Sequence, residues 1–298
     1  MAFKQIYGAV NSRPKISDNQ YGGGFRPSII AQINFATSTW ILLGACFQAL
    51  AVYLFSNGKY VLLISTLLLL LKIGRTLLQT CGVLRNPYMD GVFDGRTTAL
   101  LPDTETGEVT ESSRKKIAVL HLGAKSNHSL GYLAPQFITL GDWADKMCND
   151  FDKGNVPGFL GQSTFHRFDA KGAPELVAIS YWESIQDIWN FAYSPLHKDA
   201  WQWWERTIKS NGYVGINHEI FEADAKDWET IYVNFQPTLI GATTYLIKDG
   251  KMQGGAVADK WVSPLVDARR GTLAKSSGRM GRALQPHDDD RIAKELYA

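Results

Sequence analysis

Residues 175–182 read ELVAISYW, and the chain continues as ESIQDIWNFAYSPLHKDAWQWWERTIKSNG to Gly212 and as YVGINHEIFEAD to Asp224. The first segment is almost wholly apolar, which is typical of a strand buried on both faces. The second has helical spacing, and a glycine turn leads from it into an alternating strand. Six of the nine tryptophans lie between Trp182 and Trp228. We therefore expect any chemistry of this protein to take place in this region.

Two helices are predicted between these strands. Ser184 can cap a helix from Ile185 to Ala192, and Ser194 with Pro195 can start a second helix that reaches about Ser210. On the second helix, four large residues share one face by their spacing: His197, Trp201, Trp204 and Ile208. We expect this face to point into the domain.

The strand that follows presents a second histidine. Residues Val214, Ile216, His218 and Ile220 alternate onto one side, whereas Asn217 and Glu219 share the other. Two inward histidines among large aromatic residues favour either the wall of a cavity or a core in which both imidazoles have hydrogen-bond partners. The pattern leaves these alternatives open.

The residues before this region complete a recognisable order of elements. The spacing predicts a strand at 115–122, a helix at 139–151 and a strand at 159–168, and a last strand follows at 230–235. The order β-α-β-β-α-β is the ferredoxin-like pattern. We predict an α+β, ferredoxin-like domain over residues 115–248.

An apolar region precedes this domain. No charged residue occurs between Pro27 and Gly58, and a second apolar run follows from Tyr60 to Leu84. About 20 apolar residues cross a bilayer core, so a helix from about residue 33 to 55 is long enough. The pattern predicts a transmembrane helical hairpin over residues 27–84. The alternative is one span followed by a buried or interfacial amphipathic helix, because Lys72 interrupts the second run.

The charges that flank the hairpin predict its orientation. Basic residues lie before and after it, and its turn carries only Lys59. The positive-inside rule then places both termini in the cytoplasm and makes the chain a multi-pass membrane protein. The remaining segments are expected to be a flexible N-terminal tail at 1–26, a linker at 85–114 and a largely disordered tail at 249–298.

Composition and motifs exclude several functions. The net charge of +2 does not indicate a nucleic-acid partner. The three cysteines lack zinc spacing, so no metal site is predicted, and Cys148 is interpreted as a packing residue. The chain also lacks the usual nucleotide-binding loops and the GxSxG motif.

A family resemblance extends over about residues 115–245. Its most specific parts are Tyr181-Trp182 at a strand end, His197 followed by Trp201, the strand with His218-Glu219, and Tyr232-Val233-Asn234 followed by Pro237 and Gly241. The chain resembles the monooxygenase-like family typified by the membrane-bound enzyme of fumagillin biosynthesis, which is related to the antibiotic biosynthesis monooxygenases. It departs from many relatives at Asn217, where they have tryptophan, and at Gln236-Pro237, where they often have two prolines.

This resemblance implies a dimeric α/β-barrel and the oxidation of a lipophilic secondary metabolite, such as a terpenoid or polyketide. It implies a location at the cytoplasmic face of an internal membrane, which we take to be the endoplasmic reticulum. The expected partners are the substrate, the membrane, a second copy of the chain and a cytochrome P450. Relatives can use O₂ without a cofactor, and a haem is the alternative. A cyclase, an isomerase, a haem-dependent dehydratase and a non-catalytic partner of a P450 are the competing functions.

Such chemistry needs an apolar pocket, a base and donors that orient the substrate. We predict His197, His218 and Glu219 as catalytic residues. The predicted substrate-binding residues are Tyr181, Trp182, Trp201, Trp204, Asn127 and Asn234.

Overall fold

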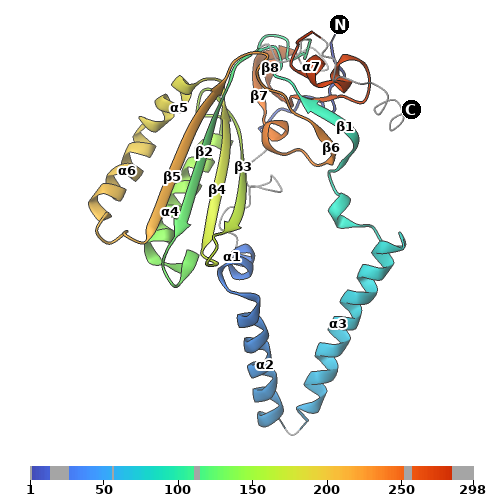
Figure 1. Cartoon of the computed structure of the whole chain (residues 1–298), viewed down its shortest axis with the longest axis vertical. Coiled ribbons are helices and arrows are strands. Elements are labelled where there is room, and N and C mark those ends of the chain that lie inside the picture. The colour runs from blue at the N-terminus through green and yellow to red at the C-terminus, as the bar shows by residue number, and fades with distance from the viewer. Residues whose placement is uncertain (1, 14–26, 56, 111–114, 252–256, 284–298) are drawn as a thin grey trace. The chain divides into compact units, whose positions relative to one another are not determined.

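The structure is a computed structural model that describes residues 2–13, 27–55, 57–110, 115–251 and 257–283. The chain divides into two compact units (Figure 1). One unit comprises Ser28–Val92, and the other comprises Met1–Pro27 with Phe93–Ala298.

The first unit is helical. A short helix α1 (Pro27–Asn34) precedes α2 (Thr37–Leu54), and α3 (Lys59–Thr80) follows. Both long helices are apolar and long enough to cross a membrane by length and composition, at about 27 Å for α2 and about 33 Å for α3. The predicted single helix from residue 33 is wrong at its start, because the backbone leaves the helix at Phe35 and Ala36 before α2 begins.

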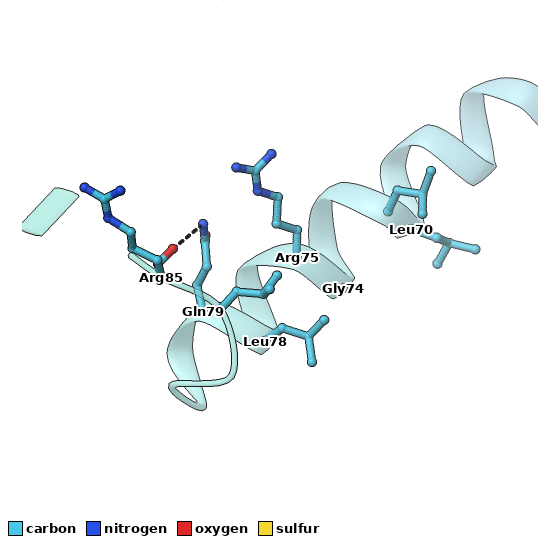
Figure 2. Close-up of a pocket in the computed structure, with 8 residues that line it drawn as sticks. Leu70, Gly74, Arg75, Leu78, Gln79 and Arg85 are labelled. Atoms are coloured by element: carbon cyan, nitrogen blue, oxygen red, sulfur yellow. Dashed lines mark hydrogen bonds between the residues drawn. The ribbon is translucent and has the colours of Figure 1, made fainter. Parts of the chain in front are cut away.

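A shallow depression lies at the C-terminal end of α3 (Figure 2). It is lined by aliphatic side chains such as Leu70 and Leu78, with Arg75 and Arg85 at one side. Gln79 Nε2 donates to the backbone oxygen of Arg85 at 3.3 Å, which turns the chain back along the helix. The depression brings no cluster of chemically reactive groups together within this described unit.

The second unit is built on a four-stranded antiparallel sheet with the order β3-β4-β2-β5. Its strands are β2 (Ile117–Ser126), β3 (Phe159–Phe168), β4 (Pro174–Trp182) and β5 (Val214–Ala223). Helix α4 (Pro135–Asp152) lies between β2 and β3 in the chain, and α5 (Ile185–Ala192) with α6 (Pro195–Thr207) lies between β4 and β5. The α+β class is confirmed, and every predicted element of residues 115–223 is present.

The predicted helix caps are also present. Ser184 Oγ accepts from the backbone N–H of Asp187, and Ser194 Oγ accepts from that of His197. Each cap ends the preceding segment in extended backbone and starts a helix, so two short helices replace one long one. Strand β4 is buried along most of its length, as its apolar sequence predicts.

A second, three-stranded sheet has the order β6-β1-β9 and joins β1 (Phe93–Ala99), β6 (Tyr232–Phe235) and β9 (Leu265–Asp267). The segment predicted to be a linker therefore contributes a central strand. Gly95 has a φ of 106°, and the register shifts between Phe93 and Arg96. The glycine and the aspartate of this strand are typical of loops, and its pairing partners are more than a hundred residues away in sequence.

The prediction of a disordered C-terminal tail is wrong for residues 257–283. This segment forms β8 (Val257–Val262), which pairs with β7 (Tyr245–Lys251), then β9 and α7 (Ser276–Arg279). Val266, Ala268 and Leu273 are buried against Leu100 and Val109. Residues 252–256 and 284–298 of the predicted tail lie outside the described residues.

The N-terminal segment is docked as well. Backbone bonds join Phe3 to Val109, Ile6 to Leu265 and Val10 to Trp261. Arg13 is buried, so the prediction of a flexible tail is wrong for residues 2–13. The rest of the predicted tail, residues 14–26, lies outside the described residues.

Candidate active site

A cavity of about 360 Å³ lies between one face of the four-stranded sheet and helices α4, α5 and α6. This volume lies in the range of small-molecule sites. The sheet forms its floor, and the helices form its roof. Most of the lining side chains are apolar, so a bound molecule is largely removed from water.

The floor is a regular array, because antiparallel pairing aligns one inward residue from each strand in every row. In the order β3, β4, β2, β5, the rows are Gln162–Ser180–Leu120–Ile220, Thr164–Ala178–Leu122–His218 and His166–Leu176–Ala124–Ile216. The two central strands contribute apolar side chains, apart from Ser180. That hydroxyl is already occupied, since it accepts from Trp182 Nε1 at 2.9 Å.

The roof and one end of the cavity are aromatic. Trp182 is fully buried, with its ring 5.0 Å from Phe159, 5.9 Å from Phe151 and 5.6 Å from Phe191 between centroids. Trp189 lines the cavity and is 52% exposed, so it lies at the mouth. The exposed positions of Ile216 and His218 indicate that the cavity opens toward β5.

His197 and His218 both line this cavity. Their imidazoles come from different elements, α6 and β5, and lie close enough for His218 to lower the pKa of His197. Burial is the larger cause of that lowered pKa, and a hydrogen bond between His197 and the backbone of Ala192 acts in the opposite direction. His197 Nδ1 is buried and has no hydrogen-bond partner among the described residues. Both histidines therefore lie in the wall of the cavity, and His197 keeps a backbone hydrogen bond at Ala192 there.

A neutral imidazole with a free ring nitrogen can accept a proton from a bound molecule. Since the pKa of His197 lies below its ordinary value, the ring is neutral at physiological pH. The Ser194 cap and the first turn of α6 fix its backbone, and its ring packs against Phe191 with 5.5 Å between centroids. His197 is thus a neutral imidazole held in the wall of the cavity.

The opposite edge of the floor carries polar side chains that the sequence analysis missed. Gln162, Thr164 and His166 all point from β3 into the cavity. Gln162 Nε2 donates to Thr164 Oγ1 at 3.4 Å, and Tyr132 Oη lies 3.4 Å from His166 Nδ1. Burial lowers the pKa of His166 and raises that of Tyr132, so both groups are neutral. The alternation of residues along the predicted strand at 159–168 could have indicated that these three side chains share one face.

Helix α4 contributes two further titratable groups to the roof. Burial, followed by the charge of Asp142, raises the pKa of Asp145. Burial raises the pKa of the Cys148 thiol to about 12, with smaller contributions from Asp145 and Asp152. A thiol that stays protonated is a poor nucleophile, which agrees with the interpretation of Cys148 as a packing residue.

Several predicted site residues lie elsewhere. Trp182 lines the cavity, but Tyr181 points to the opposite face of the sheet and packs with Trp228 and Tyr245. Glu219 also lies on that opposite face, across from His121 in the β2–β5 register. The alternation that brings His218 inward turns its neighbour Glu219 away.

The two predicted asparagines are likewise outside the cavity. Asn127 is exposed just beyond the end of β2, and its backbone N–H donates to the oxygen of Tyr213. Asn234 belongs to β6 in the second sheet, where its Oδ1 accepts from the backbone N–H of Gly95 at 2.8 Å. Neither side chain is among those that line the cavity.

The predicted inward face of α6 is only partly correct. His197 points into the cavity, but Trp201 is 52% exposed and Ile208 is 55% exposed. Trp204 is half-buried and makes an edge contact with Trp203 rather than lining the cavity. Helix α6 lies at the edge of the sheet. The apolar stripe of this helix is therefore wider than the part of the sheet that could cover it.

Within the parts of the chain that the structure describes, no group of three or more His, Cys, Asp or Glu side chains could bind a metal ion. A haem needs an axial ligand and cationic partners for its two carboxylates. His197 could supply an axial nitrogen, but none of the lining residues is a lysine or arginine that could pair with the two haem carboxylates. The described residues therefore fit a haem poorly.

Comparison with known proteins identifies relatives of this chain. Residues 117–240 match the family described as Monooxygenase af470-like. Monooxygenase af470 of Aspergillus fumigatus is 27% identical over 252 residues, which cover 83% of this chain and 88% of that protein. The resemblance inferred from the residues is thereby confirmed.

Solved structures with partial similarity include two enzymes. A crystal structure of an aldoxime dehydratase in complex with butyraldoxime is 19% identical, covers 52% of this chain and 38% of that one, and has a TM-score of 0.33. SnoaB, a cofactor-independent oxygenase from Streptomyces nogalater, is 17% identical, covers 36% of this chain and 92% of that one, and has a TM-score of 0.25.

Proposed function

Because residues 117–240 match the monooxygenase af470-like family, we propose that this chain is a membrane-anchored, monooxygenase-like enzyme that oxidises a lipophilic secondary metabolite, such as a terpenoid or polyketide. The main support is the apolar cavity of about 360 Å³, which is lined by His197 from α6 and by His218 from β5. An apolar substrate gains free energy on entering such a cavity.

In the proposed reaction, His197 removes a proton from a carbon next to a carbonyl group of the substrate. The resulting carbanion is stabilised as an enolate and reduces O₂, which forms a new C–O bond. The peroxide anion takes the proton back from His197 and becomes a hydroperoxide. Loss of water, which removes the second hydrogen of the same carbon, leaves a second carbonyl, so one O₂ yields one ketone oxygen and one water. His218 is the second candidate for the base. The proposed site excludes the predicted residues that lie outside the cavity, which are Tyr181, Glu219, Trp201, Trp204, Asn127 and Asn234.

The proposed setting is the bilayer. Helices α2 and α3 form a hairpin whose flanking basic residues favour the cytoplasmic side, and we propose the endoplasmic reticulum as the membrane. An anchored enzyme meets an apolar substrate at a higher local concentration than a free one does. We further propose a ferredoxin-like, barrel-forming homodimer, with the exposed Phe221 on the sheet face opposite the cavity as one contact.

The function is tested by deleting the gene in the source organism and restoring it as wild type, His197→Gln, His218→Gln or the control His128→Gln. His128 lies outside the cavity, beside Tyr213. Loss of the base lowers turnover by about 10²- to 10⁴-fold, so the precursor accumulates in the corresponding strain. Mass spectrometry under isotopically heavy oxygen gas follows incorporation of label into the product.

Each other outcome identifies a competing function. A product formed without label indicates a cyclase or isomerase that uses the same base. Full turnover in both histidine variants shows that neither histidine is the base. Purified protein that converts nothing alone, but raises the output of a cytochrome P450, indicates a non-catalytic partner.

A further inference from the structure

The floor of the cavity has two polar edges and an apolar centre. In its middle row, Thr164 of β3 and His218 of β5 lie at opposite ends, with Ala178 and Leu122 between them. Adjacent strands are about 4.8 Å apart, so three intervals separate the two outer backbones by roughly 14 Å. The rows on either side repeat the pattern at the β3 edge, where Gln162 and His166 flank Thr164.

The β3 edge can bind a neutral polar group. Thr164 offers a hydroxyl, Gln162 an amide and His166 an imidazole whose Nδ1 faces Tyr132. Among the residues that the structure describes, no partner is recorded for Gln162 Oε1 or for His166 Nε2. Unpaired donors and acceptors at the end of an apolar cavity favour a ligand that completes their hydrogen bonds.

The charge of the residues that line the cavity restricts the class of ligand further. Among the described residues that line the cavity there is no lysine or arginine, and their one acidic member is Asp145 on α4. Burying a carboxylate or phosphate without a cationic partner is strongly unfavourable. A ligand of this cavity is therefore uncharged.

We propose that the cavity takes a neutral, elongated molecule with a polar group at each end, one bound at the His197–His218 edge and the other hydrogen-bonded by Thr164 and Gln162 on β3. The two groups are separated by an apolar body of roughly 14 Å, which lies across β4 and β2. This inference rests on the proposed function only in taking this cavity as the substrate site. It defines the class of substrate. The end of the molecule near the mouth reacts, and the hydrogen bonds made by its other end fix its position along the cavity.

Binding of straight-chain α,ω-diols and their matching monoalcohols tests the inference. The full chain is held in lipid nanodiscs, and affinity is measured by ligand-observed NMR without turnover. We expect diols to bind best at the length whose extended oxygen separation matches the two edges. At that length, the diol is expected to bind about fivefold to tenfold more tightly than the monoalcohol, which is the effect of one additional hydrogen bond.

Two shape-conserving variants test the β3 edge. Thr164→Val and Gln162→Met keep the volume and remove the polar atoms, so each should reduce the preference for the diol, while Thr164→Ser should restore it. Comparing diol with monoalcohol within each variant cancels partitioning into the lipid. A cavity that binds monoalcohols as well as diols at every length, or a preference unchanged in both Thr164→Val and Gln162→Met, overturns the inference. Since binding needs no turnover, failure of the proposed oxidation is observed separately.

Discussion

At the scale of single residues, the candidate base is determined by its surroundings more than by its identity. His197 is half-buried, its Nδ1 has no partner among the described residues, and burial with the nearby His218 lowers its pKa. His218, by contrast, lies exposed at the mouth of the cavity. The two histidines therefore have different environments, and His197 is the better candidate for proton abstraction.

The pKa of His197 predicts the pH dependence of the reaction. A base whose pKa is lowered from its ordinary value of about 6.5 remains neutral at lower pH than an ordinary histidine does. We expect kcat/KM to be flat at neutral pH and to fall on the acid side only below pH about 6.5. The profile of the purified enzyme against its precursor checks this, with His197→Gln as the variant that should lose the acid limb. An acid limb above that pH, or one retained in His197→Gln, contradicts the assignment.

At the scale of elements, one buried arginine fixes the N-terminal segment. Arg13 Nη1 donates to the oxygen of Phe151 at 2.9 Å, and Nη2 donates to that of Phe159 at 2.8 Å. Its guanidinium also stacks on the rings of Phe159 and Trp261, 4.7 Å from each centroid. Burial lowers the pKa of Arg13 to about 10, so the group remains cationic at neutral pH. It joins α4, β3 and β8.

Replacing this arginine should destabilise the fold. Arg13→Met keeps an apolar stem but leaves two buried carbonyl groups without donors, and we expect a loss of about 2–4 kcal/mol in the free energy of unfolding. Thermal unfolding of the full chain in detergent, followed by tryptophan fluorescence, measures the change. The matched control is Lys4→Met, because Lys4 is exposed on the same segment. Equal midpoints for the two variants would show that Arg13 contributes nothing.

The C-terminal elements show why a polar sequence can still fold. Arg279 is 5% exposed, and its Nε donates to Glu229 at 2.8 Å while Nη1 donates to the backbone oxygens of Leu273 and Ala274. Ser276 Oγ donates to the same carboxylate at 2.8 Å. These polar groups have partners in the folded state, so α7 needs few apolar residues of its own.

At the scale of the whole molecule, the natural cysteines report on the proposed membrane topology. Cys46 lies within α2, and Cys81 lies directly after α3. If both hairpin ends face the cytoplasm, a membrane-impermeant maleimide should label Cys81 in intact, right-side-out microsomes and should reach Cys46 only after detergent is added. The half-buried Cys148 reacts slowly because desolvation of its thiol raises its pKa to about 12.

Mass spectrometry of the modified peptides measures this labelling, and Cys81→Ser is the control. Labelling of Cys81 that requires detergent contradicts the proposed hairpin and favours a single span that places the following domain across the membrane. Labelling of Cys46 in intact vesicles shows instead that α2 does not cross the bilayer.

Local pattern determined much of the catalytic domain. The alternating and apolar runs predicted every strand and α-helix of residues 115–223, although not the short 3-10 helix Gly131–Leu133. Ser184 and Ser194 placed the starts of α5 and α6, because these signals depend on neighbouring residues only. The resemblance carried by residues such as His197 and His218 also came from the chain itself. For the cavity, alternation alone indicated that His218 and Glu219 point to opposite faces.

Tertiary structure decided the features that depend on contacts between residues distant in sequence. Strand β1 exists because its backbone pairs with β6 and β9, which its own loop-like residues cannot indicate. The docking of residues 257–283 depends on apolar surface supplied by Leu100 and Val109. The polar edge of Gln162, Thr164 and His166 became part of a site only when the strand order β3-β4-β2-β5 placed it across an apolar floor from His218. Strand order follows from the summed free energy of many long-range contacts, so a sequence can supply the chemical groups of a site without revealing the distances between them.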